Sequence, residues 1–314
     1  MPVIGLSALV LEVPEVEEGV AFYTDAGLDA RREGDKALLT CKGRDRESII
    51  LVGGARKKRL HHIRLRADGL DEIAGKVEAG GGEIVEAPEG FAKEGLWLRD
   101  PHGLLFHLRE ETDEPPLATA TPFEINAAGR TVRVCQPALP RRSLTPPAFP
   151  LRLGHLATFS PDVPRSVKFV TEVLGMGLAD YSGEVVAFCC ARKNSDHHVI
   201  AFAKSPGIGL HHVSFMTNSP DEVGRAGRAL AEKAGRGDWG FGRHTIGSNF
   251  FHYIKDPWGS WLEYYADMDY IDDYSHWEPS DYPMEDSLHH WGPNPPSDFI
   301  DNHEVEVDQE VETA

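Results

Sequence analysis

The sequence predicts an α+β protein made of four repeated β-α-β-β-β units, which pair into two open-barrel domains. Three motifs that recur in both halves of the chain carry this prediction: Leu60-His61-His62 and Leu210-His211-His212, Asp100-Pro101-His102-Gly103 and Asp256-Pro257-Trp258-Gly259, and Pro14-Glu15-Val16 and Pro161-Asp162-Val163. A repeated unit of this size cannot bury its apolar face alone, so the units must pair their sheets. We expect repeat domains over 1–140 and 141–270, and an acidic, aromatic tail over 271–314 that partly covers the body and is disordered at its end.

The first half contains two of these units in order. Alternating apolar residues predict strands, a helical period followed by glycine predicts each helix, and Asp-Pro-His-Gly predicts a tight turn. The expected elements are a strand at 4–13, a helix at 15–27, strands at 37–41 and 47–52, a strand at 60–65, a helix at 69–81 and a hairpin over 96–108.

The second half restarts the pattern after a proline-rich linker near 136–150. The same signals predict a strand at 154–160, a helix at 162–174, strands at 185–190 and 197–203, a strand at 210–216, a helix at 220–234 and a hairpin of 250–254 with 261–265.

Glu263 lies on the second arm of the last hairpin. Side chains alternate between the two faces of a strand, so Glu263 shares a face with Trp261 and Tyr265. A carboxylate between aromatic rings is costly to bury without a strong partner. The alternative is an exposed edge strand with Glu263 in water.

The repeat allows three positions to be compared within one chain. His155 is equivalent to Ala8, His212 to His62, and Glu263 to His107. Only the C-terminal half thus places two imidazoles and one carboxylate at these inward positions. The N-terminal half keeps two histidines without a third ligand, and we interpret it as a structural copy without a complete metal site.

His155, His212 and Glu263 are therefore the predicted metal ligands. Two neutral imidazoles and one carboxylate on one face of an ion are typical of non-haem Fe(II) oxygenases, and Mn(II) fits the same ligands. In the pair His211-His212 only one ring points inward, and we expect His211 to be the outward one. Taken singly, each histidine is more often a core or surface residue than a ligand.

Composition favours an ordinary globular protein, with 26% charged and 41% hydrophobic residues. No apolar run reaches the roughly 18 residues of a membrane span, and the N-terminus does not resemble a secretory signal. The four cysteines show no disulfide or zinc spacing, which favours a reducing cytoplasm.

Residues 267–314 hold 15 acidic residues and no Lys or Arg, leaving −3 of the net −18 for residues 1–266. This tail argues against nucleic-acid binding.

With these features, the chain resembles a type I extradiol ring-cleaving dioxygenase of the vicinal-oxygen-chelate superfamily, in the catechol 2,3-dioxygenase and homoprotocatechuate 2,3-dioxygenase group. The resemblance covers residues 4–270 and rests on GHLATFSPDVPRS, DHHVIAFA, GLHHVSF and GRHTIGSNFFHYIKDPWGSWLE. His252 departs from the family pattern, which usually has an aliphatic or aromatic residue before its tyrosine. The resemblance implies cleavage of a small aromatic diol or triol beside the diol, with both atoms of O₂ inserted. A trihydroxytoluene oxygenase is one specific candidate.

The resemblance also implies roles outside the ligand set, within the catalytic domain over 141–270. His198 matches the family's proton-handling histidine, and His244 and Tyr253 match residues that hydrogen-bond the substrate oxygens. His197 and His252 are expected to point away from the site.

Alternatives in other classes are a metal-dependent isomerase of the same superfamily and a non-catalytic small-molecule binding protein. Trp239, Phe241, Trp258 and the tail aromatics could line an apolar pocket, in which no basic residue is clearly placed to bind a carboxylate. Exposed sheet edges favour a homo-oligomer.

Overall fold

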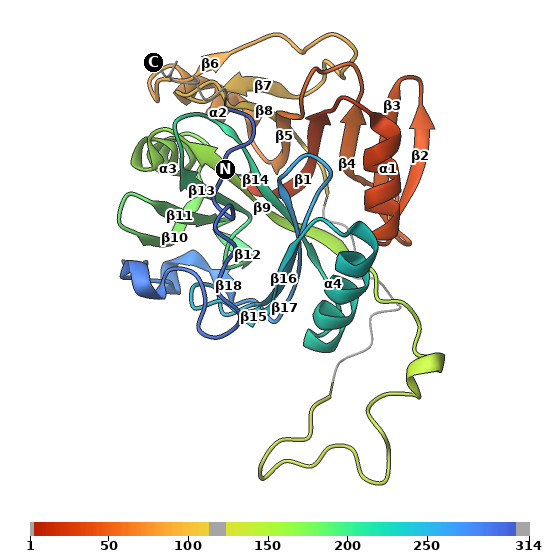
Figure 1. Cartoon of the computed structure of the whole chain (residues 1–314). Helices are drawn as coiled ribbons and strands as arrows, with labels where there is room; N and C mark the ends of the chain where they lie inside the picture. Colours follow the sequence, from red (N-terminus) through yellow and green to blue (C-terminus); the bar gives the residue numbers. More distant parts are fainter. Residues whose placement is uncertain (1–2, 113–123, 306–314) are drawn as a thin grey trace, which may run out of the picture.

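The computed structural model describes residues 3–112 and 124–305, and its core consists of two eight-stranded sheets (Figure 1). The first sheet has the order β2-β3-β4-β1-β5-β8-β7-β6. Its elements are β1 (Val3–Glu12), α1 (Val16–Asp25), β2 (Leu28–Glu33), β3 (Lys36–Cys41), β4 (Glu47–Val52), β5 (Arg59–Ala67), α2 (Leu70–Val77), β6 (Glu83–Ile84), β7 (Leu96–Arg99) and β8 (Leu105–Arg109).

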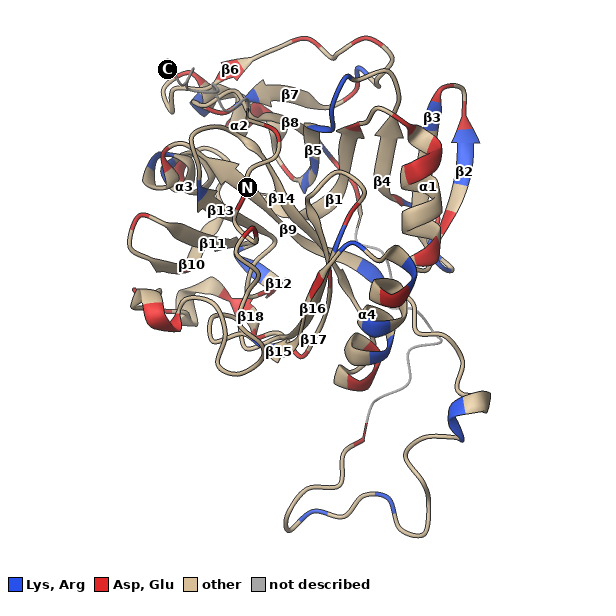
Figure 2. Ribbon diagram, viewed as in Figure 1, with Lys and Arg blue, Asp and Glu red and all other residues tan. Residues whose placement is uncertain are grey.

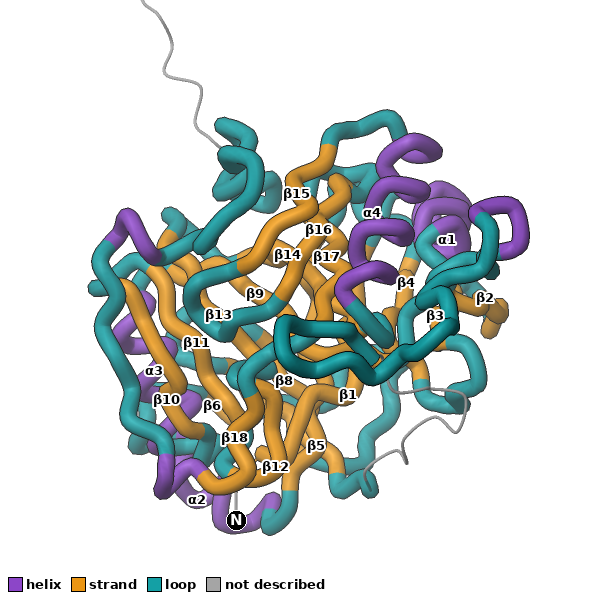
Figure 3. The backbone as a smooth tube through the Cα atoms, turned by 90° about the horizontal axis from the view of Figure 1, so that it is seen from below, coloured by secondary structure: helices purple, strands orange, loops and turns teal. Residues whose placement is uncertain are grey.

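The second sheet repeats this arrangement in the order β10-β11-β13-β9-β14-β17-β16-β15. Its elements are β9 (Arg152–Ser160), α3 (Val163–Glu172), β10 (Gly177–Ser182), β11 (Val186–Cys190), β13 (Ile200–Lys204), β14 (Gly209–Met216), α4 (Pro220–Ala234), β15 (Asp238–Arg243), β16 (Phe250–Lys255) and β17 (Trp261–Ala266). An additional pair, β12 (Lys193–Asp196) and β18 (Tyr270–Asp273), lies beside it. Short 3-10 helices are η1 (Arg142–Leu144), which precedes β9, and η2 (Tyr274–His276) and η3 (Met284–Asp286), which follow β18. The matching orders confirm the predicted α+β fold of four paired units, with strands inside and helices outside (Figure 3).

The strand register confirms which positions of the two halves are equivalent. In the first sheet Ala8 pairs with Arg64 and Arg64 with His107, whereas in the second His155 pairs with Ser214 and Ser214 with Glu263. Three adjacent strands therefore carry Ala8, Arg64 and His107 in one half and the two ligands with Ser214 between them in the other. Arg64 is buried where the second half has the small Ser214.

Most buried side chains of both halves belong to one continuous hydrophobic core. The tail also joins the halves, through Glu304. Its carboxylate accepts hydrogen bonds from the backbone amides of Leu60 (2.7 Å) and Leu210 (3.0 Å), which are equivalent residues in the repeat. Buried Lys58 lies 3.8 Å from the same carboxylate. Within the tail end that the sequence predicts to be disordered, Glu304 therefore packs against the body, while 306–314 lie outside the described residues.

Several strands differ from the sequence expectation. The residue ranges of the edge strands β2, β6, β10 and β15 were not predicted. For β2 and β6 the reason is that they are largely exposed and show no apolar alternation. His197 and His198 lie in the loop before β13 instead of on the predicted strand, since β12 is inserted there.

The charged residues lie mainly on the helices, the edge strand β2 and the loops, while most central strands contain few of them (Figure 2). Residues 124–145, which follow the first half, project away from the body, whereas Pro146 and Ala148 contact it (Figure 1). Among the described residues, no helix has the length and apolar character needed to cross a membrane.

Candidate metal centre and substrate cavity

Three side chains from neighbouring strands converge in the second sheet. His155 comes from β9, His212 from β14 and Glu263 from β17, and one ligand atom of each lies within 4.8 Å of the others. The Nε2 atom of His155 is 2.9 Å from the Glu263 Oε2 atom, and the Nε2 atom of His212 is 3.7 Å from the same oxygen. All three side chains are buried. The fold thus brings together the three residues predicted as ligands.

This donor set fits a divalent metal ion. The Nε2 atom of His212 is buried and has no hydrogen-bond partner within the described residues. Burial lowers the pKa of His212 well below its ordinary value, so the ring is neutral and offers a lone pair. Burial raises the pKa of Glu263, but the interactions with His155, His244 and His212 outweigh it and hold this pKa well below its usual range. Neutral imidazoles beside an ionised carboxylate are the forms that bind a metal.

No group of this kind occurs among the described residues of the first sheet. Within residues 3–112 and 124–305, the group in the second sheet is the one cluster of His, Cys, Asp or Glu with atoms close enough to share an ion. In the first half the rings of His62 and His107 are 6.1 Å apart, and His107 stacks on Trp97 at 4.0 Å. Burial lowers the pKa of His62 to about 2 and that of His107 to about 4, so both pack as neutral core residues.

Two polar side chains orient the carboxylate of Glu263. The hydroxyl of Ser214 donates to Oε2, and the Nδ2 atom of Asn249 donates to Oε1 at 3.0 Å. Both are buried, so each bond forms in a medium of low dielectric. Sequence reasoning missed both residues. The sequence could have indicated Ser214, because a residue two positions after His212 lies on the same face of β14.

His198 lies beside the three-residue group. Its ring packs against His155, with centroids 4.2 Å apart, and against Phe188 at 4.9 Å. It is buried, and burial followed by the nearby His155 lowers its pKa well below the ordinary value. A neutral histidine in this position can accept a proton from a bound molecule.

His244 and Tyr253 lie on the other side of Glu263. The Nε2 atom of His244 is 2.9 Å from the Tyr253 hydroxyl and 3.6 Å from Glu263 Oε1. The carbonyl oxygen of Leu288, in the tail, accepts a hydrogen bond from His244 Nδ1. Burial raises the pKa of Tyr253 well above its ordinary value, so the phenol keeps its proton and can donate it in a hydrogen bond.

His252 points away from this site, as the sequence predicted. Its Nε2 atom is 2.8 Å from Asp238 Oδ2, and its ring packs against α4 at Gly227, where a Cβ atom would collide with it. His211 differs from the expectation of an outward residue, because it is buried and packs against Phe159 and Phe299.

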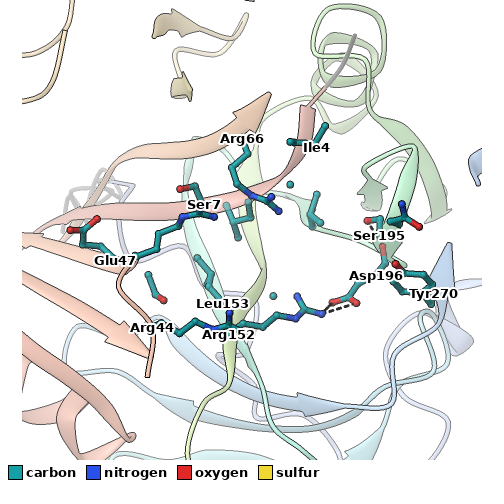
Figure 4. A pocket seen from close by; sticks show the side chains of 17 residues that line it. Ile4, Ser7, Arg44, Glu47, Arg66, Arg152, Leu153, Ser195, Asp196 and Tyr270 are labelled. Carbon is teal, nitrogen blue, oxygen red and sulfur yellow. Dashed lines mark hydrogen bonds and ion pairs between the residues drawn. The ribbon is translucent and has the colours of Figure 1, made fainter. Parts of the chain in front are cut away.

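Tyr265, Asp196 and Arg152 form a second set of contacts next to His155. Tyr265 packs on His155 with ring centroids 4.9 Å apart, and its hydroxyl donates to Asp196 Oδ2 at 2.6 Å. Arg152 pairs with the same carboxylate through contacts of 2.7 and 2.9 Å. Figure 4 shows this ion pair at the wall of a cavity of about 400 Å³ between the halves, into which Arg66 and Arg152 point from opposite sides. The ring of His155 thus packs against Tyr265 as well as against His198.

His155 and His212 line a different, mostly apolar cavity of about 240 Å³. Its walls include Phe188, Ile246 and Ala201, and the tail supplies much of the remaining cover: Met284, Ser287, Leu288, Phe299 and Ile300. The tail therefore covers the site. Trp239, Phe241 and Trp258, which we expected in this lining, lie elsewhere: Trp239 stacks behind Tyr253 at 5.3 Å, Phe241 stacks on Phe250, and Trp258 packs against the core.

Paired β-α-β-β-β units with a two-histidine, one-carboxylate group define the class of protein: residues 152–264 match the Glyoxalase/Bleomycin resistance protein/Dioxygenase superfamily. The chain is 33% identical to metapyrocatechase 2 of Cupriavidus necator, over 94% of this chain and 91% of that protein. The Mn(II)-bound glyoxalase of Novosphingobium aromaticivorans has a similar structure, with 25% identity, a TM-score of 0.71 and coverage of 94% and 95%. An extradiol ring-cleaving dioxygenase from B. fuscum shares the fold at 21% identity, with a TM-score of 0.75 and coverage of 95% and 81%.

The chain therefore belongs to the extradiol dioxygenase family of this superfamily and is an oxidoreductase. The family resemblance seen in the sequence motifs is confirmed, and so is the vicinal-oxygen-chelate fold.

Proposed function

We propose that this chain cleaves the ring of an uncharged, apolar-substituted catechol next to its diol, with O₂ as the second substrate and a non-haem Fe(II) ion held by His155, His212 and Glu263. The observation that carries the proposal is the buried three-ligand group at the base of an apolar cavity. Mn(II) would fit the same ligands, because imidazole and carboxylate separate the two ions poorly.

The bound ion would supply adjacent coordination positions for the two catechol oxygens and for O₂. The protein's residues would do the rest. His198, neutral and beside His155, would take a proton from a substrate hydroxyl. Tyr253 and His244 would hydrogen-bond the substrate oxygens from the other side of Glu263. The tail residues Leu288 and Phe299 would exclude water from the cavity.

The cavity lining supports a substrate without a carboxylate. Among the described residues, Lys204 is the one lysine or arginine that lines the cavity. Its ammonium group donates a hydrogen bond to the carbonyl oxygen of Pro161. A substrate carboxylate would therefore lose its hydration and meet only this single, solvent-exposed ammonium group as a cationic partner, which is costly. Alkyl or aryl substituents would instead contact Phe188, Ile246 and Leu288.

The test is a substrate panel after anaerobic loading with Fe(II). We expect 3-methylcatechol and 3-phenylcatechol to give yellow ring-opened products on admission of air, with kcat/KM at least about tenfold above that of 3,4-dihydroxyphenylacetate, since tenfold corresponds to only about 1.4 kcal/mol. A methyl-substituted benzenetriol belongs in the same panel. Turnover of a substrate without O₂ would instead support an isomerase, and binding of catechols without turnover would support a binding protein.

We also propose that the chain assembles with a second copy of itself through residues 124–145. This segment projects from the body and exposes Val134 (67%) and Leu144 (70%). It carries four arginines and one glutamate in a chain of net charge −18, so it complements the acidic remainder of another copy.

Light scattering after gel filtration tests this assembly. We expect the wild-type mass to be at least twice the 34.7 kDa of one chain. Leu144→Asp should weaken association about tenfold or more, because burial of a leucine contributes roughly 1.5–3 kcal/mol. Ile84→Asp, at an exposed apolar position on β6, is the matched control and should leave the mass unchanged. A monomeric wild type at high concentration would refute the assembly.

A further inference from the structure

His198 belongs to a chain of three buried polar side chains. Its Nδ1 atom lies 3.1 Å from the Nδ1 atom of His197. The Nε2 atom of His197 lies 2.7 Å from the Oδ2 atom of Asp180, which is on β10. The exposed fraction is at most 4% for all three side chains. His197, expected to face away from the site, thus contacts the residue that faces the cavity.

The chemistry of the carboxylate fixes the direction of these hydrogen bonds. An ionised carboxylate only accepts, so the Nε2 atom of His197 must carry the hydrogen that it shares with Asp180. A neutral ring protonated on Nε2 has a bare Nδ1 atom, which can only accept. The proton between the two rings therefore belongs to Nδ1 of His198. This leaves Nε2 as the unprotonated nitrogen of His198, whose side chain lines the cavity.

The surrounding structure holds these three hydrogen-bonded side chains in place. The other oxygen of Asp180 accepts a hydrogen bond of 2.7 Å from the backbone amide of Ser280. Trp277 packs on the ring of His197 at 5.4 Å, and its indole nitrogen donates to the carbonyl oxygen of Ala179. Both contacts come from the tail, so the tail that covers the cavity also fixes the Asp180 carboxylate.

The same arrangement occurs at the other histidine pair of the site. The Nδ1 atoms of His211 and His212 are 2.6 Å apart, and the carbonyl oxygen of Phe299 accepts a hydrogen bond from His211. A carbonyl can only accept, so His211 donates to Phe299 and accepts from Nδ1 of His212, which leaves Nε2 of His212 without a hydrogen. In both pairs, the first histidine connects the second to a fixed acceptor.

We propose that Asp180 and His197 are positioning residues that hold His198 as the tautomer with its hydrogen on Nδ1, so that Nε2 is the atom that accepts the substrate proton. This inference rests on the proposed function for the consequence in catalysis, but the tautomer itself is a property of the folded protein. The step moves one proton from a substrate hydroxyl to Nε2 of His198, which then carries a positive charge that the Asp180 carboxylate stabilises through His197. An outer carboxylate that orients an imidazole in this way is a general device in enzymes.

Two-bond ¹H–¹⁵N correlation spectra of the full chain, labelled at histidine and loaded with diamagnetic Zn(II), test the tautomer directly. In the wild type we expect His198 to show a protonated Nδ1 and a bare Nε2. Asp180→Asn presents an amide that can donate to His197, which reverses both rings and moves the hydrogen of His198 to Nε2. With Fe(II), the same variant should keep its metal and its KM for catechol while kcat falls about 10- to 100-fold. Asp180→Glu should restore part of the rate.

Asp238→Asn is the matched control. Asp238 makes the same kind of contact, 2.8 Å to Nε2 of His252, but that pair faces α4 instead of the cavity. It should leave the tautomer of His198 and the rate unchanged. A wild-type His198 protonated on Nε2 would overturn the inference, and this measurement does not require the variants to fold. The expected tautomer in a protein that cleaves no catechol would sustain the assignment and count against the proposed function alone.

Discussion

Replacing Glu263 by alanine is expected to abolish retention of the metal and, with it, ring cleavage. Glu263 is the one anionic side chain of the ligand group, and without it two neutral imidazoles would have to hold a divalent cation in a buried site. The variant would also leave the donors of Ser214 and Asn249 without their acceptor. Loss of an outer partner alone weakens metal binding by about 10- to 100-fold, so we expect at least the upper end of this range.

The measurement is metal content per chain after reconstitution with Fe(II) and gel filtration, with circular dichroism to show that the fold is retained. The chain supplies its own control, because His107 occupies the register position of Glu263 in the first half. His107→Gln should retain the metal content of the wild type. A Glu263→Ala protein with full metal content would contradict the ligand assignment.

His198→Phe is expected to retain the metal and to lose roughly 10²–10⁴-fold in kcat, the range for a positioned acid or base. His198 packs against His155 but is not one of the three ligands, so its loss removes a proton acceptor without opening the metal group. Phenylalanine has a ring of similar size, which keeps the contact with Phe188.

Product absorbance at saturating catechol gives kcat, and metal content is measured on the same sample. His276→Phe is the corresponding control, since His276 is exposed on η2. Its rate and metal content should equal those of the wild type. If His198→Phe cleaves catechol at the wild-type rate, His198 has no part in proton transfer.

The repeat made much of the fold predictable. Helix α4 begins and ends at the predicted residues, and the hairpin around Asp256 agrees within one residue. The reason is that strand alternation and helix period depend on neighbouring residues only. The edge strands were harder to predict, because β2 shows exposed polar residues after its first position and has no apolar face to recognise.

Within the site, the same local rules placed the proposed ligands but not their partners. A residue two positions from a ligand shares its face, so Ser214 could have been predicted from His212. Asp180 could not, because its contact with His197 depends on how the loop after β12 folds over β10. The role of the tail was also open, since nothing local indicates that Leu288 and Phe299 lie over the cavity.

The sequence by itself determined the repeated units, the inward faces of their strands and therefore the group of two imidazoles and one carboxylate. Only the tertiary structure decided which atoms support that group, which segment covers it and which side chains connect His198 to Asp180. The physical reason is that the direction of a side chain is a local property of the backbone. A hydrogen bond between Asp180 and His197 instead requires two distant segments to pack at one distance, and no periodic pattern records that distance.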